Sequence, residues 1–281
     1  MARRRISEQP TSRLAVWARR TALFSLAATF IAIIIVRSGA LDIVPALSTL
    51  AGALVLAVAA MLLACAAGIA IWREGIGGVR EAATALLIGL ALIGYPLYLG
   101  IKAYRLPAIY DVTTDPIDPP RFEAIARLRP RDANPVTYAG LYAAEQQRAA
   151  YADIEPDLTN SSPQEAYDAL LKVITRRKWH IVDARPPQPA PPREGRIEAI
   201  ARTPILGFRD DVVARVRATT DGARIDVRSA SRYGRHDLGA NAARVRGLID
   251  EVDDVLAAGP EKKPPASKPA QAPGKGSSAR R

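Results

Sequence analysis

The first hundred residues contain three long apolar runs without charged side chains, at 21–36, 43–72 and 82–101. A helix needs about 20 apolar residues to cross a bilayer, and the second and third runs reach this length. The first run is shorter, but the arginines at its ends can extend their charged groups to the membrane surface. Helices of a soluble bundle would carry a charge every few residues. The pattern therefore predicts three transmembrane helices within residues 19–105.

The predicted spans have the character of an anchor. None has an ionisable residue in its interior, where ion and proton pathways usually place one. A cleaved signal peptide would also begin with basic residues. However, only the short turn Arg37–Asp42 separates the first run from the second, which favours a retained helix. Small residues four positions apart, Ala64 with Gly68 and Ala85 with Gly89, predict close helix contacts.

Residues 106–158 show little periodicity. The stretch Tyr110–Phe122 reads YDVTTDPIDPPRF, and its prolines predict an extended linker. One short helix is expected near Leu141–Ala150, with irregular chain around it.

Two amphipathic helices are predicted in the next hundred residues. Ser162 followed by Pro163 and Glu165 is typical of a capped helix start. The apolar residues behind this start recur at helical spacing, on the face of Ala166, Leu170, Val173 and Ile174. A second helical repeat begins at Leu238 and runs to about residue 258.

Between these helices, apolar and charged residues alternate over four predicted strands. The strands are 179–183, 196–202, 211–219 and 224–229. Asp221-Gly222 predicts a tight hairpin turn, and the proline-rich stretch Arg185–Gly195 is expected to lack regular structure. We therefore expect an α+β domain with a four-stranded antiparallel sheet. Two helices cover one face of this sheet, charged side chains point outward from the other, and the element order is similar to a helix-grip arrangement.

The chain thus divides into five predicted parts. They are a basic N-terminus at 1–18, three transmembrane helices at 19–105, a linker and irregular segment at 106–158, the α+β domain at 159–258 and a disordered basic tail at 259–281. The tail is rich in proline, lysine, alanine and serine, which cannot bury enough surface to offset the entropy lost on ordering.

The net charge of +11 does not indicate nucleic-acid binding. Residues 1–20 and 259–281 each carry +5, whereas 106–258 carry −1. A nucleic-acid-binding domain should have its own basic face. The basic tail could instead rest on anionic lipid or a cell-wall polymer. The single cysteine, Cys65, lies in an apolar run and does not indicate a redox compartment.

Basic residues beside the spans predict their orientation. Six arginines precede the first span, and only Arg37 follows it. The positive-inside rule therefore places the N-terminus in the cytoplasm. Three spans then place the chain after Lys102 outside, which in a bacterium is the periplasmic side of the inner membrane.

The stretch Ser229–Val245, SASRYGRHDLGANAARV, gathers polar side chains ahead of the last helix. With the neighbouring GFRDD it defines a candidate polar site of Asp210, Asp211, Arg228, Ser231, Arg232 and Asp237. A nucleophilic site needs a serine, a base and a group that orients the base, but no G-x-S-x-G pattern is present. Neither His180 nor His236 has metal-ligand spacing. We therefore assign no catalytic residue, no metal and no cofactor.

A structural role explains the same residues. Asp237 precedes the helical repeat and can cap its backbone N–H groups, with Asn241 as an alternative cap if the helix starts later. Arg228 and Arg232 are expected to pair with Asp210 or Asp211 across the sheet.

These segments resemble a known family. GFRDDVVARVR, DVRSASRYGRHDLGANAARVRGLID and RIEAIARTPILGF are similar to the domain of unknown function 1499 family of bacteria. The membrane part with its DVTTDPIDPPRF linker resembles the proteobacterial members with three spans. This sequence departs from the family pattern at Tyr233 and His236. The resemblance implies no established activity or ligand.

Three functions are consistent with the sequence. The first is a non-enzymatic envelope binding or scaffold module, whose partners would be the lipid bilayer and an envelope protein or anionic lipid. The second is a periplasmic hydrolase that uses the corner of Ser231, Arg232 and Asp237. The third is a sensor of a small ligand or lipid, with a pocket between sheet and helices. The sequence does not define an oligomeric state.

Overall fold

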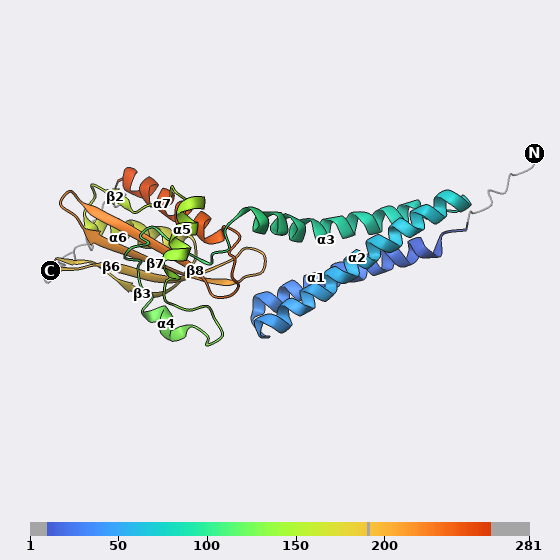
Figure 1. The fold of residues 1–281 in the computed structure, drawn as a ribbon, viewed down its shortest axis with the longest axis horizontal. Helices are drawn as coiled ribbons and strands as arrows, with labels where there is room; N and C mark the ends of the chain where they lie inside the picture. Colours follow the sequence, from blue (N-terminus) through green and yellow to red (C-terminus); the bar gives the residue numbers. More distant parts are fainter. Residues whose placement is uncertain (1–9, 190–191, 260–281) are drawn as a thin grey trace, which may run out of the picture.

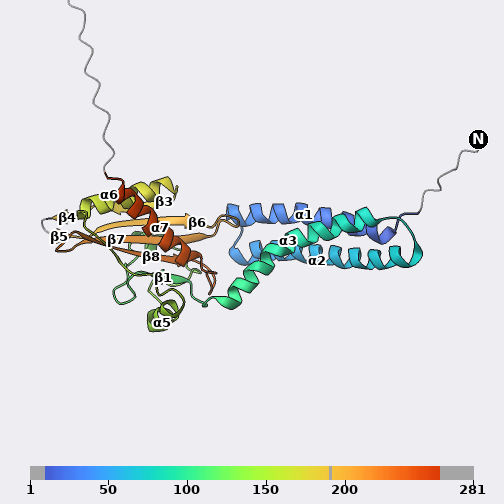
Figure 2. The ribbon, with the colours of Figure 1, turned by 90° about the horizontal axis from the view of Figure 1, so that it is seen from above.

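The protein has two parts placed end to end (Figure 1, Figure 2). The computed structural model describes residues 10–189 and 192–259. A bundle of three long helices leads into a domain built on a β-sheet, and the described chain begins at the end of the bundle farthest from the domain. Residues 1–9 of the basic N-terminus and 260–281 of the predicted tail lie outside the described residues.

Three long apolar helices lie where the spans were predicted. They are α1 (Arg13–Ser38), α2 (Ile43–Glu74) and α3 (Val79–Arg105). Each is long and apolar enough to cross a membrane, which indicates membrane association. Gly39 and Gly75 end α1 and α2 in the left-handed region, with φ of 67° and 66°, a conformation that glycine adopts without steric cost.

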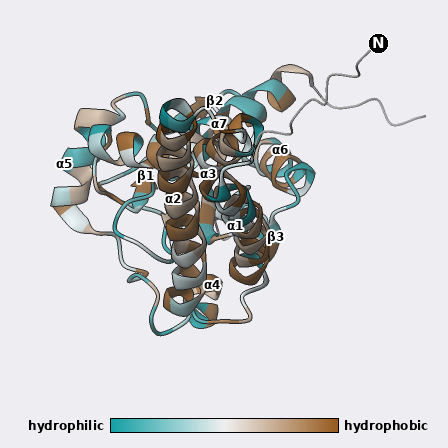
Figure 3. Ribbon diagram, turned by 90° about the vertical axis from the view of Figure 1, so that its right-hand side faces the viewer, coloured by the Kyte–Doolittle hydropathy of each residue, from teal (hydrophilic) through white to brown (hydrophobic). Residues whose placement is uncertain are grey.

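Small side chains make the contacts inside the bundle. Every buried residue of α2 is an alanine, while large apolar side chains point outward, and the ribbon of α1 and α2 is coloured hydrophobic in Figure 3. Ala85 and Gly89 are buried in α3, and a Cβ atom at Gly89 would lie 2.2 Å from Cγ of Met61. The close contact predicted at Ala85 and Gly89 is confirmed. The contact predicted at Ala64 and Gly68 is wrong at Gly68, which is exposed.

The main sheet of the domain is antiparallel and has six strands, in the order β1-β8-β7-β6-β3, with β2 also paired to β8. Its strands are β1 (Asp111–Thr113), β2 (Asp157–Thr159), β3 (His180–Arg185), β6 (Gly195–Arg202), β7 (Arg209–Ala218) and β8 (Ala223–Ser231). The four predicted strands are present as β3, β6, β7 and β8.

The predicted count of four strands is wrong because β1 and β2 come from the segment expected to be linker and irregular chain. Each has three residues, which is too short for an alternating pattern to appear. Both pair with the same edge of β8, at residues 228–230 and 223–225. The proline-rich stretch also departs from expectation, since β4 (Gln188–Pro189) pairs with β5 (Pro192–Arg193) in a small ladder.

Two helices cover one face of the sheet, as predicted. They are α6 (Pro163–Arg176) and α7 (Ala240–Ala257). Ser162 and Glu165 form the expected capping box at the start of α6. The predicted apolar faces of both helices meet the inward side chains of β6, β7 and β8 in one core cluster. This cluster includes Leu170, Val212 and Leu248.

The opposite face of the sheet is also covered, which corrects the expectation of an outward-facing charged surface. The chain between β1 and α5 (Gly140–Ala150) crosses this face and contains the short helix α4 (Ala124–Leu128). Phe122 and Ile125 pack there against Val213 and Ala230. We call residues 114–138 the cover segment. The predicted helix near 141–150 is confirmed as α5, whereas the helix-grip comparison stays a prediction.

Side chains at two points join the domain to the ends of the membrane helices. Nη1 of Arg37, in the last turn of α1, donates to the carbonyls of Pro204 and Ile205 at 2.5 and 2.8 Å. Nε2 of His236 lies 3.1 Å from the carbonyl oxygens of both Ala103 and Leu106 at the end of α3. The β6–β7 turn and the β8–α7 loop therefore face the bundle.

Candidate functional site

The six residues of the candidate polar site do not converge on one point, because the sheet separates them. Side chains alternate between the two faces of a strand, so neighbours such as Asp210 and Asp211 point in opposite directions. The group on the helix side is Asp210, Ser231 and Asp237, and the group on the opposite side is Asp211, Arg228 and Arg232.

Asp237 holds the start of α7. Its carboxylate oxygens accept from the backbone N–H groups of Gly239 and Asn241, at 2.9 and 2.8 Å. Burial raises the pKa of Asp237, although these two backbone bonds oppose the shift. The helix begins at residue 240, two residues later than the repeat suggested, and Asp237 bonds to its first turn in the manner of a cap.

Asn241 is a bridge rather than a cap. Its Nδ2 donates to the carbonyl of Tyr110 and to Oγ of Ser231, at 2.9 and 3.0 Å. Its Oδ1 accepts from Oγ of Ser229 at 2.8 Å and also from Arg244. The alternative prediction of Asn241 as helix cap is therefore wrong, because the side chain points back to the sheet. Ser231 serves as an acceptor in this bridge.

His236 is used at both ring nitrogens. Nδ1 accepts from the backbone N–H of Leu238 at 3.0 Å, and Nε2 faces the carbonyls at the end of α3. A neutral ring with its proton on Nε2 satisfies all these contacts. A nitrogen committed in this way does not act as a base toward Ser231.

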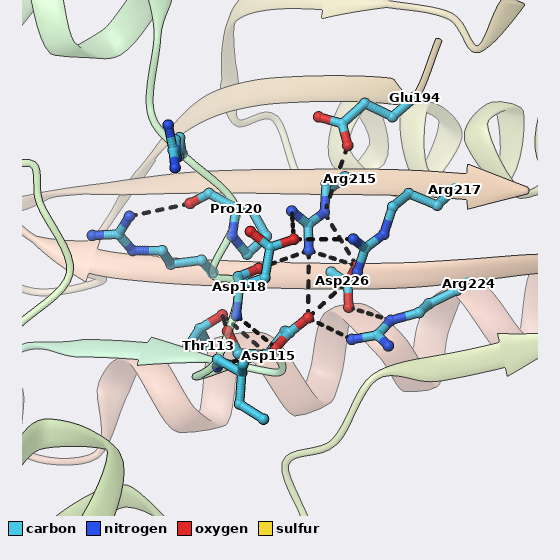
Figure 4. Close-up of polar contacts among 12 residues, drawn as sticks. Thr113, Asp115, Asp118, Pro120, Glu194, Arg215, Arg217, Arg224 and Asp226 are labelled. Carbon is cyan, nitrogen blue, oxygen red and sulfur yellow. Dashed lines mark hydrogen bonds and ion pairs between the residues drawn. The ribbon is translucent and has the colours of Figure 1, made fainter. Parts of the chain in front are cut away.

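The opposite face carries an ion-pair network (Figure 4), at the end of the sheet away from the helical bundle (Figure 1). Its members are Arg215, Arg217 and Arg224 with Asp115, Asp118 and Asp226. The fully buried Asp226 lies 3.0 Å from Arg215, 2.9 Å from Arg217 and 2.8 Å from Arg224. These three acids match the three arginines, and Glu194, 3.9 Å from Arg215, adds a further carboxylate. Because Asp115 and Asp118 belong to the cover segment, the network fixes that segment on the sheet.

Arg228 forms a second balanced pair. Its Nε and Nη2 meet the two oxygens of Asp111 at 2.9 and 2.7 Å. Its other donors meet the carbonyls of Pro120 and Val136, and its guanidinium stacks over the ring of Phe122. Burial raises the pKa of Asp111, and Arg228 acts against that shift. The prediction that Arg228 pairs with Asp210 or Asp211 is wrong, because β1 brings Asp111 closer.

Glu198 of the sheet binds backbone groups of the cover segment. This side chain of β6 has no exposed surface. Its carboxylate accepts from the backbone N–H groups of Glu123, Ala124 and Ile125, at 2.8, 3.1 and 2.8 Å. The free N–H groups at the start of α4 are thus satisfied by a carboxylate from the sheet.

Asp211 is shared by two buried arginines. Nε of Arg129 lies 2.7 Å from one oxygen and Nε of Arg232 lies 2.9 Å from the other, so the expected pairing of Arg232 with Asp211 is confirmed. Nη2 of Arg129 is buried without an acceptor. Nη2 of Arg232 is 2.8 Å from Asp211 but makes no hydrogen bond. Two cations on one carboxylate leave one positive charge unmatched.

Comparison with known families identifies this domain. Residues 111–252 match the family described as protein of unknown function (DUF1499). The chain belongs to the DUF1499 family. The match begins at β1 and ends within α7, so the DUF1499 region includes the cover segment and its ion pairs. No curated protein and no solved structure matches the chain.

The described part of the DUF1499 domain contains a groove and a smaller cavity. A groove of about 1220 Å³ beside the β4–β5 hairpin is lined by charged residues that include Arg185, Glu194 and Arg196. A cavity of about 450 Å³ under the cover segment is lined by Tyr138 and Arg228 among others. Burial raises the pKa of Tyr138 to about 12, so its hydroxyl stays neutral. Of the six candidate residues, Arg228 lines the smaller cavity and the other five line neither.

Metal-ligating side chains do not gather in the part of the chain that the structure describes. No three His, Cys, Asp or Glu residues in it are grouped as a metal ion would require.

Several residues that organise the DUF1499 domain were not predicted. Asp111, Asp115 and Asp118 come from the supposed linker, and Glu198 was expected to point outward. The sequence contains one usable signal, because the strands β6, β7 and β8 place seven arginines but only three acids on the face opposite the apolar core. These are Arg196, Arg202, Arg209, Arg215, Arg217, Arg224, Arg228, Glu198, Asp211 and Asp226. Such an excess of arginines indicates that acids from another part of the chain cover part of this face.

Proposed function

We propose that this protein is a membrane-anchored, non-catalytic module. It holds its DUF1499 domain at the periplasmic surface of a bacterial inner membrane, where the domain binds an envelope component, a protein or anionic lipid. The proposal rests on the contacts that the candidate polar residues make. Their side chains are bound to backbone groups or to other polar side chains of the fold, and they do not line a common cleft.

Exposed side chains of the bundle support the membrane anchor. Trp17 and Trp72 lie near the end that carries the N-terminus, and Trp72 is 90% exposed. Tyr98 and Tyr104 lie near the domain, and Tyr104 is 94% exposed. Aromatic side chains favour both interfaces of a bilayer, so this distribution is the one expected of a bundle that crosses it.

A binding role explains the contacts of Ser231, Asp237 and His236 better than a hydrolase does. Ser231 accepts a hydrogen bond from Asn241, Asp237 holds the start of α7, and His236 contacts α3. A serine hydrolase would need a free base beside its nucleophile. The arrangement instead favours a rigid scaffold with its ligands on the outer surface.

Cysteine labelling tests the proposed sidedness. In a Cys65→Ser background, Asn160→Cys places a single thiol on the exposed surface of the domain. Glu74→Cys places one at the end of α2, on the opposite side of the proposed membrane. A membrane-impermeant maleimide applied to intact spheroplasts should label the first variant and should label the second only after lysis. The reverse pattern would show that the domain is cytoplasmic.

Crosslinking in cells tests the proposed binding. A photoreactive amino acid at exposed positions of the domain, such as Asn160, should recover a defined envelope protein or lipid from living cells. The same residue at the lipid-facing position Phe24 serves as the control for capture by the bilayer alone. Domain positions that recover nothing beyond this control would contradict a binding module.

A further inference from the structure

Three arginines stand in a row at the end of the sheet that faces the membrane helices. Arg202 of β6 lies directly opposite Arg209 of β7. Arg232, which follows β8 on the other side of β7, donates its backbone N–H to the carbonyl of Arg209. All three side chains project from the face that holds Asp211. Opposite residues in a sheet have Cβ atoms about 5 Å apart, and like charges at this spacing are destabilising.

The acids within reach do not neutralise this row. Asp211 lies on the same face, and the buried side chains of Arg129 and Arg232 already share it. Asp132 of the cover segment also lies at this end, where it accepts from the hydroxyl of Tyr233 at 3.4 Å and forms no ion pair with the row. Arg202 and Arg209 are exposed and have no ion pair within residues 10–189 and 192–259. Two arginines therefore share Asp211, and Arg202 and Arg209 add unpaired positive charge at the surface beside them.

The other end of the same face shows that such an excess is not general. Arg217 and Arg224 also lie opposite each other, in β7 and β8. There the cover segment supplies Asp115 and Asp118, and with Asp226 they balance the arginines. The fold thus neutralises one row of arginines from within and leaves the other row open.

The open row lies where a bilayer would present its headgroups. Arg202 and Arg209 flank the β6–β7 turn, and the carbonyls of Pro204 and Ile205 in that turn accept from Arg37 in the last turn of α1. Gly207 of the same turn lies close to Arg37, since a Cβ atom added to Gly207 would be 3.2 Å from Cγ of Arg37. The row is therefore next to the end of a helix that is long and apolar enough to span a membrane.

We infer that Arg202 and Arg209, backed by the unmatched charge of Arg129 and Arg232, bind the phosphate headgroup of an anionic phospholipid. Guanidinium groups recognise phosphate through paired N–H donors. A bound phosphate would relieve the repulsion between the two exposed arginines. This inference deepens the proposed function, since it names the lipid class and the surface that binds it.

Reconstitution of the full chain tests this site. We would place wild type and Arg202→Gln/Arg209→Gln in nanodiscs of phosphatidylcholine, with and without phosphatidylglycerol. The matched control is Arg185→Gln/Arg196→Gln, another pair of opposite arginines on the sheet, which has acidic partners. The measurements are the thermal unfolding midpoint and the phosphatidylglycerol retained per protein, by native mass spectrometry.

Phosphatidylglycerol should raise the midpoint of wild type and of the control, and it should leave that of the double variant unchanged. Each basic residue near an anionic surface adds about fivefold to the affinity, so loss of two should weaken retention roughly 25–30-fold. In pure phosphatidylcholine the double variant should be at least as stable as wild type, because it has lost a like-charge contact.

Equal lipid dependence of wild type and double variant would overturn the inference. A second result would also overturn it. If inorganic phosphate raised the wild-type midpoint in phosphatidylcholine as much as phosphatidylglycerol does, the site would bind a soluble ion. Cysteine labelling reports sidedness without regard to lipid, so a failure of the lipid site and a failure of the proposed topology are distinguishable.

Discussion

Arg228 illustrates how single residues of this domain carry charge inside the fold. Its side chain is 2% exposed and all its contacts are made within the domain. Taking an ion out of water costs several kcal/mol, and removal of one partner from a buried pair costs about 3–5 kcal/mol. Such a residue therefore fixes the path of the cover segment. It does not leave a reactive group free for chemistry.

Asp157 provides a pH-dependent test at the same scale. It lies in β2 beside Asp253 of α7, and burial, with the charge of Asp253, raises the pKa of Asp157 to about 6. The folded state therefore binds this proton more tightly than the unfolded state, in which the pKa is about 3.9. The stabilisation is complete below about pH 4 and is lost as the pH rises through about 6.

We therefore expect Asp157→Asn to reduce the fall in stability between pH 4 and pH 7 and to be more stable than wild type at pH 7.5. Thermal unfolding across this pH range measures both effects. Asp221→Asn is the control, since Asn-Gly keeps the hairpin turn and this exposed residue should leave the pH profile unchanged. A wild-type slope in Asp157→Asn would contradict the assignment.

At the scale of elements, short segments depend on partners that are distant in sequence. β1 is three residues long. The side-chain amide of Gln147 in α5 accepts from the backbone N–H of Thr113 at 3.0 Å and donates to the carbonyl of Thr113 at 2.6 Å. α4 has five residues and its first N–H groups are satisfied by Glu198 of β6. An isolated helix of this length would not be stable in water. The sheet therefore determines the structure of the cover segment.

The start of α7 gives a prediction for an element. Asp237→Ala removes the two bonds to Gly239 and Asn241 and should lower stability by about 1–2 kcal/mol, the usual cost of losing a helix cap. The thermal midpoint should fall, and hydrogen exchange should accelerate in the first turn of α7. Asp254→Ala, an exposed residue of the same helix, should change neither. An unchanged midpoint in Asp237→Ala would contradict the capping role.

At the scale of the whole molecule, the DUF1499 domain follows the bundle end to end (Figure 1), and polar contacts at two corners attach it there. Arg37 meets the β6–β7 turn and His236 meets the end of α3. In Gly239, next to this second contact, φ is 75° and an added Cβ would lie 3.0 Å from a methyl of Leu106. The chain itself supplies a third connection after Arg105. Together these contacts set the orientation of the domain relative to the helical bundle.

Arg37→Gln tests this arrangement. The variant should lose the bonds to Pro204 and Ile205, so hydrogen exchange in residues 203–208 should become faster. The thermal midpoint of the domain should stay close to that of wild type, because neither core cluster of the domain contains Arg37. Arg20→Gln, at the opposite end of α1, should leave exchange in that turn unchanged. Unaltered exchange in Arg37→Gln would show that the contact does not hold the domain.

The sequence alone determined the local features of this protein. Runs of apolar residues of helix-spanning length specify α1, α2 and α3, because hydrophobic burial depends on composition along the chain. The capping box at Ser162 and the hairpin at Asp221-Gly222 are likewise encoded by adjacent residues. Periods of 3.6 and 2 residues specified the two helices, the four longer strands and the apolar core between them.

The tertiary structure alone decided the second layer of the domain. Alternating charged residues on a strand look the same in sequence whether water or another part of the chain covers them. Only the return of the cover segment, with Asp115 and Asp118, buries that face and supplies partners for its arginines. Ion pairs between residues about a hundred positions apart leave no local pattern, and for this reason the pairing of Arg228 with Asp111 and of Arg215 with Asp118 could not be read from the sequence.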